Sequence, residues 1–387
     1  MLHSAKAILT THTGSLPRPH ALLQLYGRRA RGEAVEESAI EAAGREAMHA
    51  AVHGQIECGI DIGNNGEQQR EGFFLYMQRR LTGFGGSWRR WPRQDVERYP
   101  EYKRMSEQRE VGREGVTSLV PPCVVGEVRY REPALAAAEP IEFCQTLKTL
   151  GGGFREAFMS APSPGIIASA CKNEYYASED AYLEALAEAL RLEYEAVIKQ
   201  GLLLQVDCPD LALERHRSYQ DQPEAPFLGF VERTVAAINH ALRNVPRDRV
   251  RVHVCWGNYE GPHDCDVPLK TIWPILRKLN VGGFVLPFAN GRHAHEFRVF
   301  ETLPLADDQI IVAGVIDTLT NFVEHPETVA ERLMRVAEVV GDPTRVLAGT
   351  DCGFDSTAGQ GRVASDVAWA KLRALVEGAR IASKRLF

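Results

Sequence analysis

The chain has 387 residues, of which 44% are hydrophobic and 25% are charged, a composition typical of a globular protein with room for one large core or two modest ones. Its formal net charge of -6 argues against an obligate nucleic-acid partner, because surfaces that bind nucleic acid normally carry an excess of basic residues. No window approaches the roughly 20 consecutive apolar residues that cross a bilayer. Because the N-terminus lacks a signal-peptide core and the eight cysteines are scattered, we expect a cytoplasmic protein with reduced thiols and no nucleic-acid or membrane partner.

Short apolar runs alternate with helical patterns from the N-terminus onward. Residues 8–11 predict a first strand that ends in the polar loop 12–17, and residues 36–54 have helical spacing before a second strand at 59–63. Between 83 and 135 this alternation stops, and the many glycines, tryptophans and arginines indicate an inserted excursion with a β-hairpin.

The alternation resumes after the excursion. Residues 165–170 predict a third strand, and residues 202–209 predict a fourth that is largely apolar, as in a strand buried on both faces. Between them, Ser178 is the expected N-cap of a helix that stops at Gly201. The remaining predicted elements are strands at 249–255, 282–287, 310–317 and 345–353, and helices at about 230–244, 326–341 and 363–384.

Eight such strands, separated mostly by helices, predict a (β/α)8 TIM barrel, whose reactive groups gather at the C-terminal ends of the strands. We expect a single barrel domain over residues 1–387, with the excursion after the second βα unit. An open, doubly wound sheet is the alternative, but no Gly-x-Gly-x-x-Gly sequence follows the first strand.

The strand at 249–255 carries His253 and Cys255, whose side chains project from the same face because they are two positions apart. Zinc uses an imidazole and a thiolate together, and Cys352 at another strand end is the expected third ligand. Three protein ligands leave one coordination position open, which is typical of catalytic metal sites. The alternative is a buried cysteine beside a core histidine that is already hydrogen-bonded.

Five motifs carry a resemblance to a known family: residues 10–17 (TTHTGSLP), 65–67 (NGE), 207–209 (DCP), 253–255 (HVC) and 350–353 (TDCG). In this order and spacing, the chain resembles the catalytic half of cobalamin-independent methionine synthase over nearly its whole length. It is most similar to the short, single-barrel branch of that family, which also resembles epoxyalkane:coenzyme M transferase.

The resemblance implies a zinc-dependent alkyltransferase in which His253, Cys255 and Cys352 hold the metal. A small thiol would bind the zinc as a thiolate, which remains nucleophilic at neutral pH and attacks an alkyl donor. The expected cofactor is therefore zinc, and the expected partners are a small thiol and a small alkyl donor. A homo-oligomer is also compatible with the family.

The resemblance also implies substrate-facing residues. Ser15 would contact the polar tail of the thiol, while Glu67 and Asp207 would receive its ammonium group. Two carboxylates at one barrel mouth suit a cation, although either could instead pair with a nearby arginine. We expect Asp317 and Glu67 to be the catalytic carboxylates.

The sequence departs from the family pattern at two positions. Pro287 stands where the family has its fourth zinc ligand, a glutamate, and Leu319 stands where methionine synthase has a histidine thought to act as an acid. The N-terminal half that helps hold folate is also missing from this sequence. Methyl transfer from folate is therefore less expected than thiol activation. The alternatives are a lyase that adds a thiol to an epoxide, and a barrel that binds a small molecule without chemistry.

Several other polar stretches receive a structural interpretation. Residues 293–296 (HAHE) resemble a metal cluster but are expected to begin a helix, and residues 263–266 (HDCD) form either a polar loop or a replacement metal ligand. Arg292 is expected to bind an anionic substrate tail, and Trp256 to form a pocket wall. We expect three further arginines to form a solvated face of the excursion: Arg89, Arg90 and Arg93.

Overall fold

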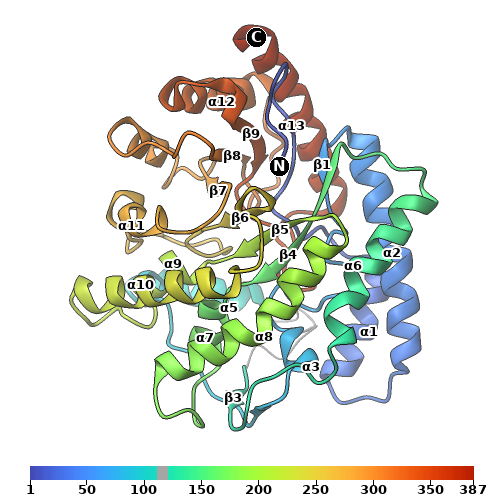
Figure 1. Cartoon of the computed structure of the whole chain (residues 1–387), viewed down its shortest axis with the longest axis vertical. Helices are drawn as coiled ribbons and strands as arrows, with labels where there is room; N and C mark the ends of the chain where they lie inside the picture. The colour runs from blue at the N-terminus through green and yellow to red at the C-terminus, as the bar shows by residue number, and fades with distance from the viewer. Residues whose placement is uncertain (111–120) are drawn as a thin grey trace.

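A curled, fully parallel sheet forms the centre of the computed structural model, which describes residues 1–110 and 121–387 (Figure 1). Seven strands are hydrogen-bonded side by side in the order β1-β4-β5-β6-β7-β8-β9. Their bounds are β1 Ile62–Gly63, β4 Glu156–Pro162, β5 Leu203–Asp207, β6 Val250–His253, β7 Gly283–Pro287, β8 Ile310–Ile316 and β9 Val346–Thr350.

The segment before the first helix fills the eighth place and closes the sheet. Thr10 makes a parallel bridge to Ala348 of β9, and Thr11 makes one to Ile62 of β1. The backbone N–H of Thr11 donates to the Ala348 carbonyl at 2.9 Å, and that of Ile62 donates to the Thr10 carbonyl at 2.9 Å. The prediction of a (β/α)8 barrel is therefore confirmed.

Helices surround this sheet, with α2, α6, α8, α12 and α13 visible around it in Figure 1. The helices are α1 His20–Ala30, α2 Glu37–Cys58, α3 Met77–Arg80, α4 Gln94–Glu97, α5 Pro100–Glu110, α6 Ala134–Thr149, α7 Pro164–Ala170, α8 Glu179–Lys199, α9 Asp210–Leu213, α10 Glu224–Ala241, α11 Leu269–Leu276, α12 Pro326–Val340 and α13 Ser365–Leu386. Four 3-10 helices add η1 Glu214–His216, η2 Arg247–Arg249, η3 Glu296–Glu301 and η4 Pro343–Arg345. Within the described residues, no helix combines the length and apolarity that crossing a bilayer requires.

The helix boundaries follow the local signals in the sequence. Ser178 caps α8, because its side chain accepts the backbone N–H of Ala181 at 3.1 Å. Pro326 occupies the first turn of α12, where a missing N–H costs nothing, and Gly341 ends that helix at a φ of 78°. These predicted ends are confirmed.

The predicted strand at 165–170 is wrong, because these residues form α7. Ser163 accepts the backbone N–H of Ile166 at 2.9 Å, and Pro164 occupies the first turn. The apolar run alone could not distinguish a buried helix from a buried strand, whereas the cap and proline signals favour the helix. The strand in this unit is β4, which pairs with β1 and β5, so the total of eight is unchanged.

The excursion contains an antiparallel pair of strands as predicted, but a long connection joins them and not the short turn of an ordinary hairpin. The two strands are β2, Phe84–Gly85, and β3, Cys123–Val124. Helices α4 and α5 lie between these strands in the chain, and residues 111–120 of the excursion lie outside the described part.

One ion cluster joins the loop after β1 to α6. The Glu139 carboxylate, 4% exposed, accepts hydrogen bonds from Arg70 at 2.9 Å and from Asn65 at 2.7 Å, and it also pairs with Arg80. Burial raises the pKa of this carboxyl, but the two guanidinium groups outweigh that effect and hold the pKa at about 2. Glu139 is therefore ionised in the folded protein at neutral pH.

Glu139→Gln should destabilise the fold by about 3–5 kcal/mol at neutral pH, because it leaves the buried Arg70 guanidinium without the negative charge that compensates it. Since the folded pKa lies below the unfolded value of about 4.3, the stabilisation is complete above that value and is lost as the pH falls towards 2. Urea unfolding at several pH values measures this difference. Glu132→Gln, at an exposed position just before α6, is the matched control. Equal stability of the Glu139 variant and the wild type at pH 7 would contradict the assignment.

Candidate active site

Three donor side chains meet at the C-terminal ends of β6 and β9. The Cys352 Sγ atom lies 3.6 Å from His253 Nε2 and 3.7 Å from Cys255 Sγ, and the three donor atoms all lie within 4.8 Å of one another. His253 Nδ1 is 3.3 Å from the Val285 carbonyl of β7. Because a carbonyl only accepts, Nδ1 carries the hydrogen and the Nε2 lone pair faces the two sulfurs. This donor set, with one nitrogen and two sulfurs, fits zinc.

The two thiols differ in acidity because they share a hydrogen bond. That bond from Cys352, together with the nearby His253 imidazole, holds the pKa of Cys255 well below its usual range in spite of burial. The same contact, together with burial, raises the pKa of Cys352. Cys255 is therefore the more readily deprotonated of the two, and the thiolate is the form that binds a metal.

These three residues lie in the wall of a cavity of about 500 Å³. This volume is in the range of ordinary small-molecule sites. The cavity is also lined by Ser15, Glu67 and Asp207, so the structure brings together six of the predicted site residues.

Glu67 is held in an unusual conformation at the edge of this cavity. Its φ of 55° is rare for a residue other than glycine, and its backbone carbonyl accepts a hydrogen bond from Arg18 at 2.8 Å. One carboxylate oxygen accepts from the Ser160 hydroxyl at 2.6 Å. The other oxygen is buried and has no partner among the described residues, so it is available to a ligand in the cavity.

Asp207 ends β5 and faces the same space. Its side chain accepts a hydrogen bond from Gln205 at 2.8 Å. Burial raises its pKa to about 7; His253 opposes this increase in part, and Glu67 adds a smaller increase. A cationic group bound between the two carboxylates would favour their ionised forms.

Comparison with known proteins agrees with this geometry. The chain is 26% identical over 382 residues to the methionine synthase of Thermococcus kodakarensis, and this match covers 97% of this chain and 94% of the relative. It is 25% identical over 384 residues to the methionine synthase of Sulfurisphaera tokodaii, covering 97% and 93%. The resemblance to cobalamin-independent methionine synthases is confirmed. No protein-family model matches the chain.

The barrel is also that of a solved methionine synthase. The B12-independent methionine synthase from Shewanella sp. W3-18-1, in complex with selenomethionine, superposes with a TM-score of 0.70 at 20% identity. The superposition covers 98% of this chain and 99% of the other. The similarity therefore extends over the whole barrel and is not confined to the motifs.

The two departures from the methionine synthase pattern lie beside the cysteines. Pro287 ends β7 and lines a small adjoining cavity of about 30 Å³ together with Leu319, Cys255 and Cys352. Asp317 lines this smaller space, where its carboxylate accepts the backbone N–H of Leu319 at 3.2 Å and the hydroxyl of a nearby threonine. Asp317 therefore shares this smaller space with Cys255 and Cys352 but does not line the main cavity.

Two predicted substrate-binding residues lie outside the main cavity. Trp256 lines the small cavity instead, and its Nε1–H donates to the Val267 carbonyl at 2.6 Å. Arg292 is exposed, lines neither cavity and extends towards the Asp264 carbonyl at 3.5 Å.

The excursion supplies arginines that the sequence interpretation missed. Arg90 and Arg93 line the main cavity, so the prediction that they form a solvated face is wrong. Arg93 lies with its guanidinium 4.0 Å from the centre of the Tyr259 ring, and Arg90 pairs with Glu214. Only Arg89 is exposed as expected. The cause is tertiary, because the excursion folds back over the barrel mouth, and no local periodicity signals that return.

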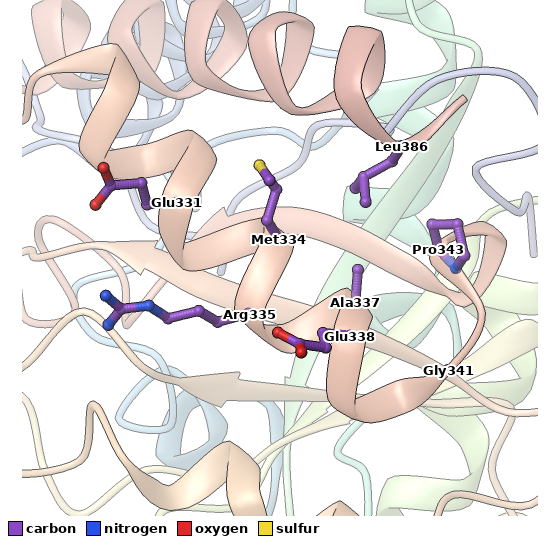
Figure 2. A pocket seen from close by; sticks show the side chains of 8 residues that line it. All are labelled: Glu331, Met334, Arg335, Ala337, Glu338, Gly341, Pro343 and Leu386. Atoms are coloured by element: carbon purple, nitrogen blue, oxygen red, sulfur yellow. The ribbon is translucent and has the colours of Figure 1, made fainter.

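Another hollow, of about 540 Å³, lies on the outside of the barrel between α12 and the end of α13 (Figure 2). It is lined by Glu331, Met334, Arg335, Ala337, Glu338, Gly341, Pro343 and Leu386. This groove contains neither histidine nor cysteine and none of the motif residues. The barrel mouth is therefore the candidate active site.

Proposed function

We propose that this chain is a methionine-synthase-like methyltransferase that alkylates the sulfur of a small thiol, with zinc held by His253, Cys255 and Cys352. The observation that supports this most strongly is the convergence of the three donor atoms within 4.8 Å at the wall of a ligand-sized cavity. A bound zinc ion would lower the pKa of a substrate thiol and present it as a nucleophile at neutral pH.

The chain's own residues orient that thiol. The Val285 carbonyl fixes the ring of His253, so its lone pair and the two cysteine sulfurs face the cavity. Ser15 packs against Gly353, immediately after Cys352, where its hydroxyl can reach the polar end of a small substrate.

The substrate we favour is an amino-acid thiol such as homocysteine. Its ammonium group would bind between Asp207 and the unpartnered oxygen of Glu67, both of which face the cavity. The relatives named methionine synthase, which match this chain along nearly its whole length, support this choice.

The identity of the alkyl donor is less constrained. It depends on Pro287, whose side chain has no atom that could serve as a fourth metal ligand. A zinc ion held by three protein ligands, two of them thiolates, would bind the sulfur of the substrate more tightly than a zinc ion that also has a carboxylate ligand. The substrate sulfur would then be a poorer nucleophile. This favours an activated donor over the methyl group of folate. The second candidate function is therefore a lyase that adds the thiol to an epoxide, and it rests on Pro287 and Leu319 beside the cysteines.

An assay with defined substrates distinguishes these functions. The zinc-loaded protein is incubated with homocysteine and, in separate reactions, with a methyl-folate, a small methylated metabolite or an epoxide, and the sulfur product is identified by mass spectrometry. We expect alkylation of the sulfur with an activated donor and little methionine from the folate. Rapid folate-dependent methionine formation would overturn the inference about the donor. Failure of every thiol and donor with zinc present would overturn the proposed function.

A further inference from the structure

Three arginines from two separate segments lie in the wall of the main cavity. Arg90 and Arg93 belong to the excursion, and Arg217 follows η1 in the connection after β5. We propose that these three side chains bind an oxyanion, most simply a carboxylate, that the alkyl donor carries. This assignment rests on the proposed function, because it names the class of the second substrate of the same cavity.

One acidic side chain pairs with this group of arginines. Glu214, which is fully buried, forms an ion pair with Arg90 at 2.5 Å. Arg217 donates its Nε hydrogen to the Trp91 carbonyl at 2.9 Å. Neither Arg217 nor Arg93 forms an ion pair with any residue that the structure describes. Two of the three positive charges are therefore left without a paired carboxylate.

An aromatic ring, and not an acid, holds the guanidinium of Arg93. Its Cζ atom lies 4.0 Å from the centre of the Tyr259 ring, a cation–π contact that covers one face of the group. Its Nε atom is buried and has no hydrogen-bond partner among the described residues. The nearby Asp95 carboxylate accepts instead from the Tyr259 hydroxyl at 2.6 Å and from the backbone N–H of His263 at 2.9 Å. The N–H edge of Arg93 therefore remains available to a planar acceptor such as a carboxylate.

The electrostatics of the group favour an anionic ligand. Burial lowers the pKa of Arg217 to about 9, and Arg90 and Arg93 contribute to this decrease. Burial also lowers the pKa of Arg93; Tyr259 opposes this effect in part, and Arg90 adds to it. Arg217 is still a cation at neutral pH, and a buried positive charge without a counter-charge is unfavourable. An oxyanion in the cavity would supply the missing negative charge.

The thiol has its own partners, which leaves the arginines to the second substrate. In the proposed complex, Glu67 and Asp207 receive the ammonium group of the thiol, and Ser15 lies at its polar end. The fourth arginine of the cavity wall, Arg362, already has Glu260 as a partner at 3.4 Å. The two arginines without a paired carboxylate are therefore assigned to the alkyl donor.

The oxyanion subsite lies next to the cysteine loop. Tyr259, which holds Arg93, lines the main cavity and packs against Gly257, two residues after Cys255. An oxyanion bound by the arginines leaves the rest of a small donor inside the cavity that Cys255 and Cys352 also line. The arginines would therefore orient the donor for attack by the thiol.

Matched pairs of donors test the subsite in the zinc-loaded protein with homocysteine. Glycidate is compared with 1,2-epoxypropane, and dimethylsulfoniopropionate with trimethylsulfonium. We expect the carboxylate-bearing member of the reactive pair to have a kcat/KM about 10–100-fold higher in the wild type. This preference should largely disappear in Arg93→Gln and in Arg217→Gln, through the KM for the donor. The KM for homocysteine should stay unchanged.

Arg89→Gln is the matched control, because Arg89 is an exposed arginine of the same excursion that does not line the cavity. It should keep the full preference for the carboxylate. Equal use of both members of a pair by the wild type would overturn the proposal. A higher KM for homocysteine in the arginine variants, with the KM for the donor unchanged, would overturn the assignment to the donor.

Binding without turnover separates the oxyanion subsite from the proposed reaction. In calorimetric titrations without thiol, dimethylsulfoniopropionate should bind the wild type and Arg89→Gln about 10–100-fold more tightly than Arg93→Gln. The ligand-free Tm of Arg93→Gln should equal or exceed that of the wild type, because the change removes an uncompensated charge, whereas loss of a structural ion pair would lower the Tm. Equal affinity in all variants, or no binding to the wild type, would refute the subsite even if the thiol is alkylated. Arginine-dependent binding without any turnover would support the subsite and count against the proposed reaction.

Discussion

Cys352→Ala should lower turnover by about 10³-fold or more, because loss of a catalytic metal removes several kcal/mol of transition-state stabilisation. Cys255→Ala should have the same effect. Both residues lie at the barrel mouth with their sulfurs 3.7 Å apart, and both line the cavity. Each variant should also hold one zinc ion fewer than the wild type. Steady-state kinetics and metal analysis on the same preparations measure the two effects.

The barrel itself should survive these changes. The cysteine side chains lie past the ends of β6 and β9, outside the two apolar layers that pack the strands. Circular dichroism and Tm should therefore stay close to wild-type values. Cys144→Ala, at a partly buried cysteine on α6, is the matched control and should keep full zinc and activity. Full zinc content in either cysteine variant would remove that residue from the ligand set.

Asp207→Asn should raise the KM for a thiol that carries an ammonium group by about 10–100-fold, since a hydrogen bond to a charged group contributes about 1.5–3 kcal/mol. Asparagine has nearly the same shape, so it tests the charge and not the volume. Zinc content should stay unchanged, because Asp207 lies with Glu67 on the substrate side of the cavity.

A thiol that lacks the ammonium group is the control for this variant. Its KM should be the same in the wild type and in Asp207→Asn, because no positive charge reaches the carboxylate. If every thiol, with or without the ammonium group, reacts equally well with both proteins, the amino-acid substrate is refuted. A thiol with an anionic tail then becomes the better candidate, with the arginines of the cavity wall as its partners.

The barrel could be predicted because its signals are local. Strand β5 is fully buried and mostly apolar, and the caps at Ser178 and Gly341 mark helix ends where the structure has them. Strand β4 was not predicted, because its first two residues are partly exposed and its run includes small residues. The neighbouring α7 is more apolar, and so it was mistaken for the strand.

The candidate site could be predicted in part for a geometric reason. Parallel strands end at one mouth, so His253, Cys255 and Cys352 had to lie near one another once the barrel was assigned. The positions of Arg90 and Arg93 had no such basis. They depend on how the excursion crosses the mouth, and such a path leaves no periodic pattern in the sequence.

The closure of the barrel by the N-terminal segment also determines when the site can form during synthesis. Thr13 and Thr350, hydrogen-bonded to each other, are 337 residues apart, so the ring cannot close until nearly the whole chain has left the ribosome. Contacts of this separation form slowly and leave earlier strands with an open edge. Because Cys352 closely follows the strand that completes the ring, closure of the barrel and assembly of His253, Cys255 and Cys352 into one cluster become the same late folding event.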